Sequence, residues 1–293
     1  MPWLVPAVAP AIHAPNSQQP PADQAKALVK VSALARDAKV KPGDTTHVAV
    51  VLDVEKGWHL YWPGQSDSGT PVAVILSFPG DSGLTAGAVS YPLPSRLLLS
   101  GDILDYVLEG KVVLTVPVNV PASATIGRRI KVAAAVQYLV CHESCIPGED
   151  RASATIEVAE KTEPAEANAK LIDDARAAQP RPQSDGFDTA AAAAWDGPDT
   201  LVITAKAPGV TKATFYPAAD GAKLLDPVKT GQTSGPALRL RFAPGLKPAD
   251  GVVELRSGNT VQAWSFRMPR PAGPGGPAAP PAATGSPTGK PKG

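Results

Sequence analysis

Residues 131–158 read KVAAAVQYLVCHESCIPGEDRASATIEV, and this stretch decides the fold. Apolar residues alternate with other residues up to Cys141 and again after Cys145, which is the pattern of a β-strand with one buried face. The simplest interpretation is a strand, a three-residue connection and a returning strand, with His142, Glu143 and Ser144 in the connection. We therefore expect an antiparallel hairpin that has a cysteine on each side of its tip.

Short alternating runs of the same kind fill most of the chain. Turn-forming segments such as KPGD, FPGDSG and PASATIG separate them, at intervals typical of an all-β sandwich. The runs of residues 28–159 predict one antiparallel sandwich. A second set of runs predicts a smaller β-sandwich domain over residues 195–269. The expected fold class is all-β.

The remaining segments are expected to lie outside the two sandwiches. Residues 1–14 are apolar and end in a small residue, like a secretory signal peptide that has lost its basic start. Residues 15–27 are predicted to be a flexible leader. Residues 160–194 are predicted to form a linker, partly loose and partly helical, with the helix over residues 163–180. Residues 270–293 are rich in Pro and Gly and are predicted to be a disordered tail.

Charge and hydropathy exclude several classes of partner. The formal net charge is +1 and the chain has no Lys/Arg cluster, so we expect no binding to nucleic acid or to an anionic membrane surface. The chain has no apolar run of the roughly 20 residues that a spanning helix needs, so we expect no direct membrane span.

The cysteine pair is the main functional signal, because Cys141 and Cys145 are the two cysteines of the chain. A three-residue hairpin connection brings flanking Cα atoms to roughly the 5.5 Å that a disulfide requires. A bond that closes such a short loop stabilises a fold much less than one between distant residues. Short or exposed disulfides are more readily reduced than buried structural ones, as a cycling pair requires. The neighbouring His142 would favour a thiolate and Glu143 would oppose one.

Two other interpretations of the pair stay open at this point. The disulfide can be static and merely hold a recognition hairpin, which would make the protein a non-catalytic binding module. Alternatively, two thiolates and His142 can hold Cu(I), or Zn(II) with a fourth ligand, in a copper-handling protein. No second cysteine pair and no His pair completes a metal site, so we expect no metal and no cofactor.

Several segments in order resemble one known family. The order and approximate spacing are similar to those of the N-terminal periplasmic domain of DsbD-type disulfide interchange proteins, in particular the ScsB-like branch linked to copper tolerance. The segments that carry the resemblance are GWHLYWPGQSDSGTP (57–71), FPG (78–80), YPLPSR (91–96), DYVLEGKVVLTVPV (105–118) and YLVCHESCIPGE (138–149). The resemblance covers residues 28–159. The second β-domain is similar to the additional immunoglobulin-like unit of that branch.

The resemblance implies an immunoglobulin-like fold with a redox-active pair, Cys141 and Cys145, in which Cys145 attacks and Cys141 resolves. It implies a loop that caps the cysteines, and Tyr106 in GDILDYVLEG is the expected cap. Tyr138, His142 and Glu143 are expected around the pair.

Two further parts of the family pattern lie before residue 70. The residues that match the family's aromatic stretch are expected to serve packing: Trp58, His59, Tyr61 and Trp62. Asp67–Gly69 fits the family spacing. The Pro-Gly usually found just before it is replaced by Gln65 and Ser66, so the shape of this loop is expected to differ.

The function implied is a periplasmic module that takes electrons from a membrane donor and passes them to thioredoxin-fold proteins by thiol-disulfide exchange. If active, it would be a protein-disulfide reductase. Family members usually continue into a multi-span membrane domain and a thioredoxin-like domain, and this chain has neither. The donor is therefore expected to be a separate polypeptide, unless the domain has been adapted to another use.

Overall fold

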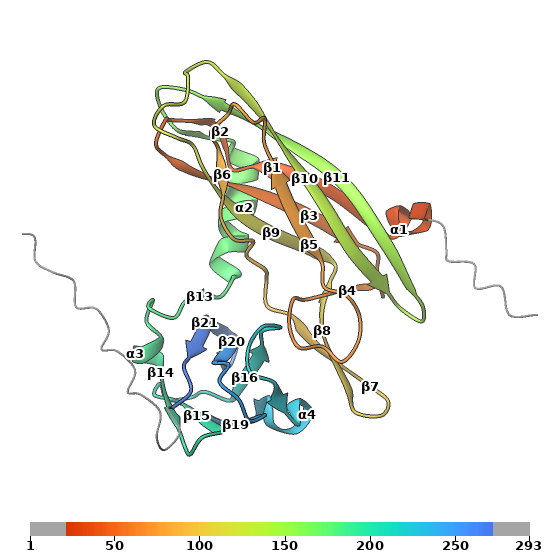
Figure 1. The fold of residues 1–293 in the computed structure, drawn as a ribbon, viewed down its shortest axis with the longest axis vertical. Helices are drawn as coiled ribbons and strands as arrows, with labels where there is room; N and C mark the ends of the chain where they lie inside the picture. The colour runs from red at the N-terminus through yellow and green to blue at the C-terminus, as the bar shows by residue number, and fades with distance from the viewer. Residues whose placement is uncertain (1–21, 272–293) are drawn as a thin grey trace, which may run out of the picture.

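The computed structural model describes residues 22–271, which form two β units joined by a helix (Figure 1). The first unit contains a short N-terminal helix and eleven main strands or strand segments. Their bounds are α1 (Ala22–Leu28), β1 (Val29–Ala35), β2 (Asp37–Val40), β3 (Thr45–Val54), β4 (His59–Tyr61), β5 (Ala73–Ser77), β6 (Thr85–Ala86), β7 (Ser95–Leu99), β8 (Ile103–Glu109), β9 (Lys111–Asn119), β10 (Arg129–Cys141) and β11 (Cys145–Val158).

The second unit begins with β13 and is built from shorter strands, and the short strand β12 and the long helix α2 precede it. The bounds are β12 (Glu163–Pro164), α2 (Glu166–Ala178), β13 (Arg181–Pro182), α3 (Phe187–Ala190), β14 (Ala191–Trp195), β15 (Thr200–Ala205), β16 (Lys212–Pro217), β17 (Leu224–Leu225), α4 (Pro227–Thr230), β18 (Gln232–Thr233), β19 (Ala237–Phe242), β20 (Ala249–Ser257) and β21 (Thr260–Met268).

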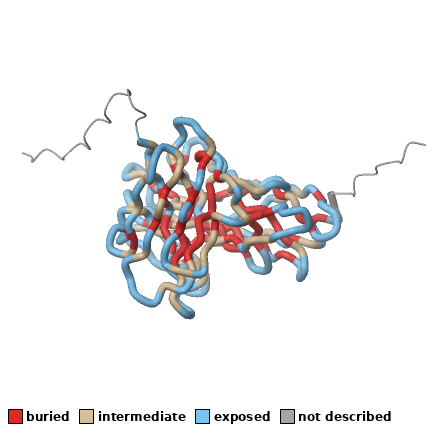
Figure 2. The backbone as a smooth tube through the Cα atoms, turned by 90° about the horizontal axis from the view of Figure 1, so that it is seen from below, coloured by how far each residue is buried: buried red, intermediate tan, exposed pale blue. Residues whose placement is uncertain are grey.

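Each unit is a sandwich of two sheets. In the first unit, a sheet of order β1-β3-β9-β6 faces a larger sheet of order β12-β2-β11-β10-β4-β8-β7, in which β5 also pairs with β10. In the second unit, the sheets have the orders β13-β21-β20-β16-β18 and β14-β15-β19-β17. Buried residues lie in the interior of both units and exposed residues lie at the loops (Figure 2). The expected all-β fold with two sandwiches is confirmed.

The β10–β11 hairpin is the longest element of the first unit. Its strands pair without a bulge from Arg129↔Glu157 to Cys141↔Cys145. Even-numbered residues of β10 are buried from Ile130 to Val140, while most odd-numbered residues are partly or fully exposed. The alternation seen in the sequence therefore places one face of this hairpin on the core, as expected for a half-buried sheet.

The segments outside the sandwiches differ from expectation in three places. Residues 22–27 are part of α1 rather than a flexible leader, because Ala25 is fully buried in the core of the first unit. The predicted helix is present as α2, but it is not part of a loose linker, since Ile172 packs against Ala49, Val51 and Val113. The second unit begins at β13 and not at residue 195, because β13 pairs with β21 and because Phe187 and Ala191 are in the core of this unit.

The chain ends are described only in part. The predicted signal peptide (1–14), residues 15–21 of the predicted leader and residues 272–293 of the predicted tail lie outside the described residues. Arg270, which we assigned to the tail, packs on the second unit instead. Its guanidinium donates hydrogen bonds to the carbonyls of Pro198 and Ala243, and stacks 5.3 Å from the centroid of the Trp195 ring.

The two units share a packed interface. Tyr216, Val252 and Ala263 of the second unit belong to the same buried cluster as the core of the first unit. The Tyr216 ring contacts the rings of Trp62 and Tyr106, with centroids 6.3 and 5.8 Å away. Apolar and aromatic contacts of this kind favour a fixed arrangement of the two units.

Candidate functional site

The candidate site lies at the tip of the β10–β11 hairpin. Cys141 ends β10 and Cys145 begins β11, and the two residues are directly paired across the hairpin. Their sulfurs form a disulfide, with the Cα atoms 4.2 Å apart. His142, Glu143 and Ser144 form the connection, which is closed by a hydrogen bond of 3.1 Å from the His142 amide to the Ser144 carbonyl. The predicted hairpin and its three-residue connection are confirmed.

The two cysteines differ in exposure. Cys141 is 1% exposed and packs with Tyr61 and Val107, whereas Cys145 is exposed at the start of β11. Thiol-disulfide exchange requires an attacking sulfur to reach one sulfur of the bond, while the other leaves. Cys145 is therefore the more accessible of the two residues to an external thiol.

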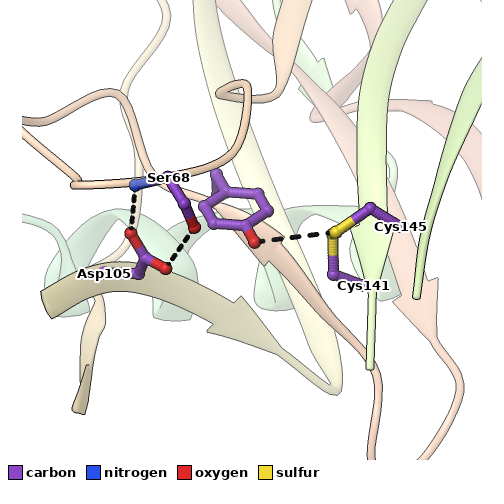
Figure 3. The surroundings of a disulfide bond; sticks show 5 residues. Ser68, Asp105, Cys141 and Cys145 are labelled. Carbon is purple, nitrogen blue, oxygen red and sulfur yellow. Dashed lines mark hydrogen bonds between the residues drawn. A yellow bond between two sulfur atoms is a disulfide. The ribbon is translucent and has the colours of Figure 1, made fainter. Parts of the chain in front are cut away.

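Tyr61 of β4 lies beside the disulfide. Strand β4 runs next to the end of β10, where His59 pairs with Cys141, so Tyr61 is two residues further along on the same face. The Tyr61 hydroxyl is 4.0 Å from Cys145 Sγ, a distance at which either atom can donate a hydrogen bond (Figure 3). The side chain is buried in a cluster with Cys141 and Val107, with Leu97 and Leu139 at its margin.

Residues 63–72 form a loop that packs against the Tyr61 ring. The buried carboxylate of Asp105 accepts hydrogen bonds from the Ser68 amide (2.8 Å) and from the Ser68 hydroxyl (2.6 Å) (Figure 3). The next residue, Gly69, has φ +76° and lies so close to Tyr61 that an added Cβ would be 2.2 Å from the ring. Only glycine fits both the backbone angle and the space.

His59 is a second ring at the site. It is buried, and its ring lies edge-on to that of Tyr61 with the centroids 5.4 Å apart. Burial lowers the pKa of His59 below its usual value of 6.5, because the charged form loses hydration, although Glu109 and Asp105 act in the opposite direction. The imidazole beside Cys141 is therefore neutral at pH 7.

The structure corrects the expected position of Tyr106. This residue does not cap the sulfurs: it is fully buried in the main core, where its ring lies 6.3 Å from that of Trp62. Neighbouring residues in a strand point to opposite faces, so Val107 rather than Tyr106 joins the cluster of Cys141. Burial raises the pKa of Tyr106 to about 12. Most of the segment expected to be a capping loop, GDILDYVLEG, is strand β8, which pairs with β4 and β7.

The other predicted residues lie in two places, the connection of the hairpin and its core face. His142 and Glu143 are exposed in the connection, and the His142 ring lies 5.7 Å from that of Trp58. Tyr138 faces the core and donates a hydrogen bond of 3.1 Å to Asp150, so it is not grouped with the sulfurs.

Sequence analysis assigned His59 and Tyr61 to packing and missed their place at the site. Their alternate spacing in a short strand was the available signal.

Within residues 22–271, no group of three or more His, Cys, Asp or Glu side chains is placed to hold a metal ion. No helix in this part of the chain is long and apolar enough to cross a membrane.

Comparisons with known proteins point to one family for the first unit. Residues 25–157 match the family model described as "Thiol:disulfide interchange protein DsbD, N-terminal". A search of curated protein sequences finds no match.

Among solved structures, the N-terminal periplasmic domain of ScsB from Proteus mirabilis is similar over 83% of this chain and 94% of that chain, with 11% identity and a TM-score of 0.55. This likeness shows that both units share the fold of the ScsB domain.

Two further structures from Neisseria meningitidis are each similar over about half of this chain. The reduced DsbD N-terminal domain is 18% identical and covers 51% of this chain and 97% of that chain, with a TM-score of 0.27. The complex between the DsbD N-terminal and PilB N-terminal domains gives 16% identity over 47% of this chain and 88% of that chain, with a TM-score of 0.25. Both scores are low, so the fold assignment rests on the ScsB domain alone.

Proposed function

We propose, from the premise that residues 25–157 are a domain of the DsbD N-terminal family, that this protein relays reducing equivalents by thiol-disulfide exchange. The observation that carries the proposal is the asymmetry of the disulfide: Cys145 is exposed and Cys141 is sheltered. A purely structural bond has no need of an accessible sulfur, whereas an exchanging bond requires one.

The chemistry needs only the two cysteines of this chain and two of a partner. In the reduced protein, the Cys145 thiolate attacks one sulfur of the partner's disulfide, and the other partner sulfur leaves as a thiolate. The Cys141 thiolate then attacks Cys145 Sγ of the mixed disulfide and releases the second partner thiolate. The bond between Cys141 and Cys145 closes, two electrons have passed to the partner, and the two protons lost by the cysteines are taken up by the partner's thiolates.

A dithiol donor recharges the module by the same two steps in reverse. Its thiolate attacks the exposed Cys145 sulfur and Cys141 leaves as a thiolate. The donor's second thiolate then attacks the donor sulfur of this mixed disulfide, which closes a disulfide on the donor and releases the Cys145 thiolate. The proposed acceptors are thioredoxin-fold proteins, and the proposed donor is a separate membrane protein. The proposed compartment is the periplasm, which the family assignment supports, as does the name of the ScsB domain as a periplasmic one.

The test is to trap the mixed disulfide on the Cys141→Ser variant of the full chain, which keeps Cys145 but cannot resolve an adduct. The probe is a thioredoxin-fold protein whose resolving cysteine is replaced by serine and whose remaining cysteine carries a thionitrobenzoate disulfide, so that attack by the Cys145 thiolate forms the adduct and releases thionitrobenzoate. We expect a covalent one-to-one adduct, sensitive to dithiothreitol, with the link on Cys145 in peptide mass spectra.

The matched controls are Cys145→Ser, whose sheltered Cys141 should react far more slowly, and the Cys141→Ser, Cys145→Ser double variant, which should form no adduct. An adduct that forms as fast on Cys145→Ser as on Cys141→Ser, or no adduct with Cys141→Ser, would contradict the proposal. Non-covalent binding of the probe that persists in the double variant, with no adduct to Cys141→Ser, would support a static binding module instead.

A further inference from the structure

The loop of residues 63–72 connects the disulfide site to the second unit, which itself contains no cysteine. The Gln65 side chain makes three hydrogen bonds across the interface between the units. Its Nε2 donates to the carbonyls of Ala218 and Ala222, both at 2.9 Å, and its Oε1 accepts from the Leu224 amide at 3.0 Å. The Gln65 amide adds a fourth, to the Pro217 carbonyl at 3.0 Å. Gln65 of the first unit therefore makes four hydrogen bonds to the second unit.

The three residues after Gln65 are fastened to β8, one after another. The Ser66 hydroxyl accepts a hydrogen bond from the Tyr106 amide at 3.0 Å. The Asp67 carboxylate accepts from the Leu104 amide at 2.8 Å, and the Asp67 amide donates to the Leu104 carbonyl at 3.1 Å. Ser68 follows with its two hydrogen bonds to Asp105, described above. The loop therefore has little freedom between the second unit and Ser68.

Beyond Ser68, the loop places Gly69 against the ring of Tyr61. Gly69 is in contact with the ring, and the backbone beyond it returns to Tyr61, because the Val72 amide donates to the Tyr61 carbonyl at 3.0 Å. A ring covered in this way has few alternative rotamers. Its hydroxyl is directed at Cys145 Sγ.

We propose that the second unit positions Tyr61 over Cys145 through Gln65 and the 63–72 loop. Gln65 is then a positioning residue for the exchange reaction, and the second unit is a brace for the site. This inference rests on the proposed function, since it assigns the second unit a part in the same chemistry.

The consequence is electrostatic and concerns the reduced protein. When the disulfide opens, Cys145 becomes a thiol that must ionise before it attacks. A tyrosine hydroxyl held beside the sulfur donates a hydrogen bond to the thiolate, and hydrogen bonds to ionised groups are stronger than those to neutral groups. Tyr61 thus favours the thiolate of Cys145. A loop released from the second unit would let the ring turn away and lose this effect.

The test measures the pKa of the Cys145 thiol in the reduced full chain. The readout is the rate of alkylation by iodoacetamide as a function of pH, followed at Cys145 by peptide mass spectrometry. We compare the wild type with Gln65→Met, which removes all three side-chain hydrogen bonds at similar volume, and with Tyr61→Phe, which removes the hydroxyl. The matched control is Arg96→Met, because Arg96 also bridges the units, through Pro227 and Val228, but lies outside the loop.

We expect Tyr61→Phe to raise the Cys145 pKa by about one unit, as for the loss of a hydrogen bond to a charged group. Gln65→Met should raise it in the same direction, and the double variant should equal Tyr61→Phe alone, since both changes remove the same interaction. Arg96→Met should lower the melting temperature but leave the pKa unchanged.

An unchanged Cys145 pKa in Gln65→Met, or a pKa shift in Arg96→Met as large as that in Gln65→Met, would overturn the inference. So would additive shifts in the double variant. If Gln65→Met unfolds the second unit, Gln65→Asn keeps the amide while shortening its reach, and the same pKa shift is expected from it.

The proposed function is judged separately. It fails if Cys141→Ser forms no mixed disulfide, whatever the value of the Cys145 pKa.

Discussion

The two β units use different aromatic residues. Four of the five phenylalanines are in the core of the second unit, and four of the five tyrosines are in the first unit. The second-unit residues are Phe187, Phe215, Phe242 and Phe266, and the first-unit residues are Tyr61, Tyr91, Tyr106 and Tyr138. Phenylalanine supplies apolar area alone, whereas tyrosine adds a polar tip that seeks a partner when buried.

The contacts of these rings follow the same division. In the second unit, Phe215 packs edge-on against Phe242 and Phe266, with centroids 6.0 and 6.4 Å away. In the first unit, tyrosine hydroxyls meet the Cys145 sulfur, the Val72 carbonyl and the Asp150 carboxylate. The core rings of the second unit are therefore mainly apolar, whereas three tyrosines of the first unit place a hydroxyl beside a polar partner or a sulfur. If the second unit is a brace, substitutions in its core should mainly lower the free energy of unfolding. Substitutions in the first unit should mainly change the reactivity of the cysteine pair.

The largest expected effect is the loss of a core ring in the second unit. Phe215 is fully buried, so Phe215→Ala should reduce the free energy of unfolding by about 3–5 kcal/mol through lost burial and a cavity. Urea denaturation measures the change. Leu246→Ala is the control, because Leu246 is 96% exposed and its truncation should change stability by less than about 0.5 kcal/mol. Equal losses of stability from Phe215→Ala and Leu246→Ala would contradict the proposed difference between the two units.

A smaller stability effect is expected from the disulfide itself. The bond closes a loop of only a few residues, so the Cys141→Ser, Cys145→Ser variant should lose about 2 kcal/mol in the chain-entropy model. The reduced wild type is the control and should unfold at nearly the same urea concentration as the variant. A loss as large as that of Phe215→Ala would mean that the disulfide is mainly structural.

The smallest expected effect is a pH dependence confined to the first unit. None of the four histidines is in the second unit, and the pKa values of His47 and His59 are both lowered, mainly by burial. The folded state then binds fewer protons than the unfolded state, so stability is greatest above the unfolded pKa of about 6.5. It falls as the pH drops below that value and levels off below the folded pKa values.

Urea denaturation between pH 7.5 and pH 5 measures this loss. His59→Gln and His47→Gln should each make the profile flatter, and the two together should remove most of its slope in this range. A profile of unchanged slope in the double variant would show that other groups are responsible.

The hairpin and its cysteines were predictable because they depend on local rules. Alternation with a period of two identifies β10 and β11, and the three residues between Cys141 and Cys145 leave little choice for the connection. The helix α2 was predictable for similar reasons, since its composition and the proline after it mark its end.

The surroundings of the disulfide were not predictable, because they depend on strands far apart in the sequence. The pairing of β4 with the end of β10 brings Tyr61 to Cys145, across more than 80 residues of chain. The choice between Tyr106 and Val107 depends on the phase of β8, and a strand pattern alone does not say which face meets the cysteines. Gln65 looked like a departure from the family pattern, and its bonds to Ala218 and Ala222 exist only once both units have folded.

The most direct measurement is the redox equilibrium of the pair in the full chain. The protein is equilibrated in glutathione buffers of graded potential, and its free thiols are counted after acid quenching. A disulfide that exchanges should have a midpoint potential at or above about −270 mV, the potential of thioredoxin. It should therefore be open in most molecules once the buffer potential falls below that value. A bond that stays closed at about −270 mV would contradict the central claim and leave Cys141–Cys145 as a structural link.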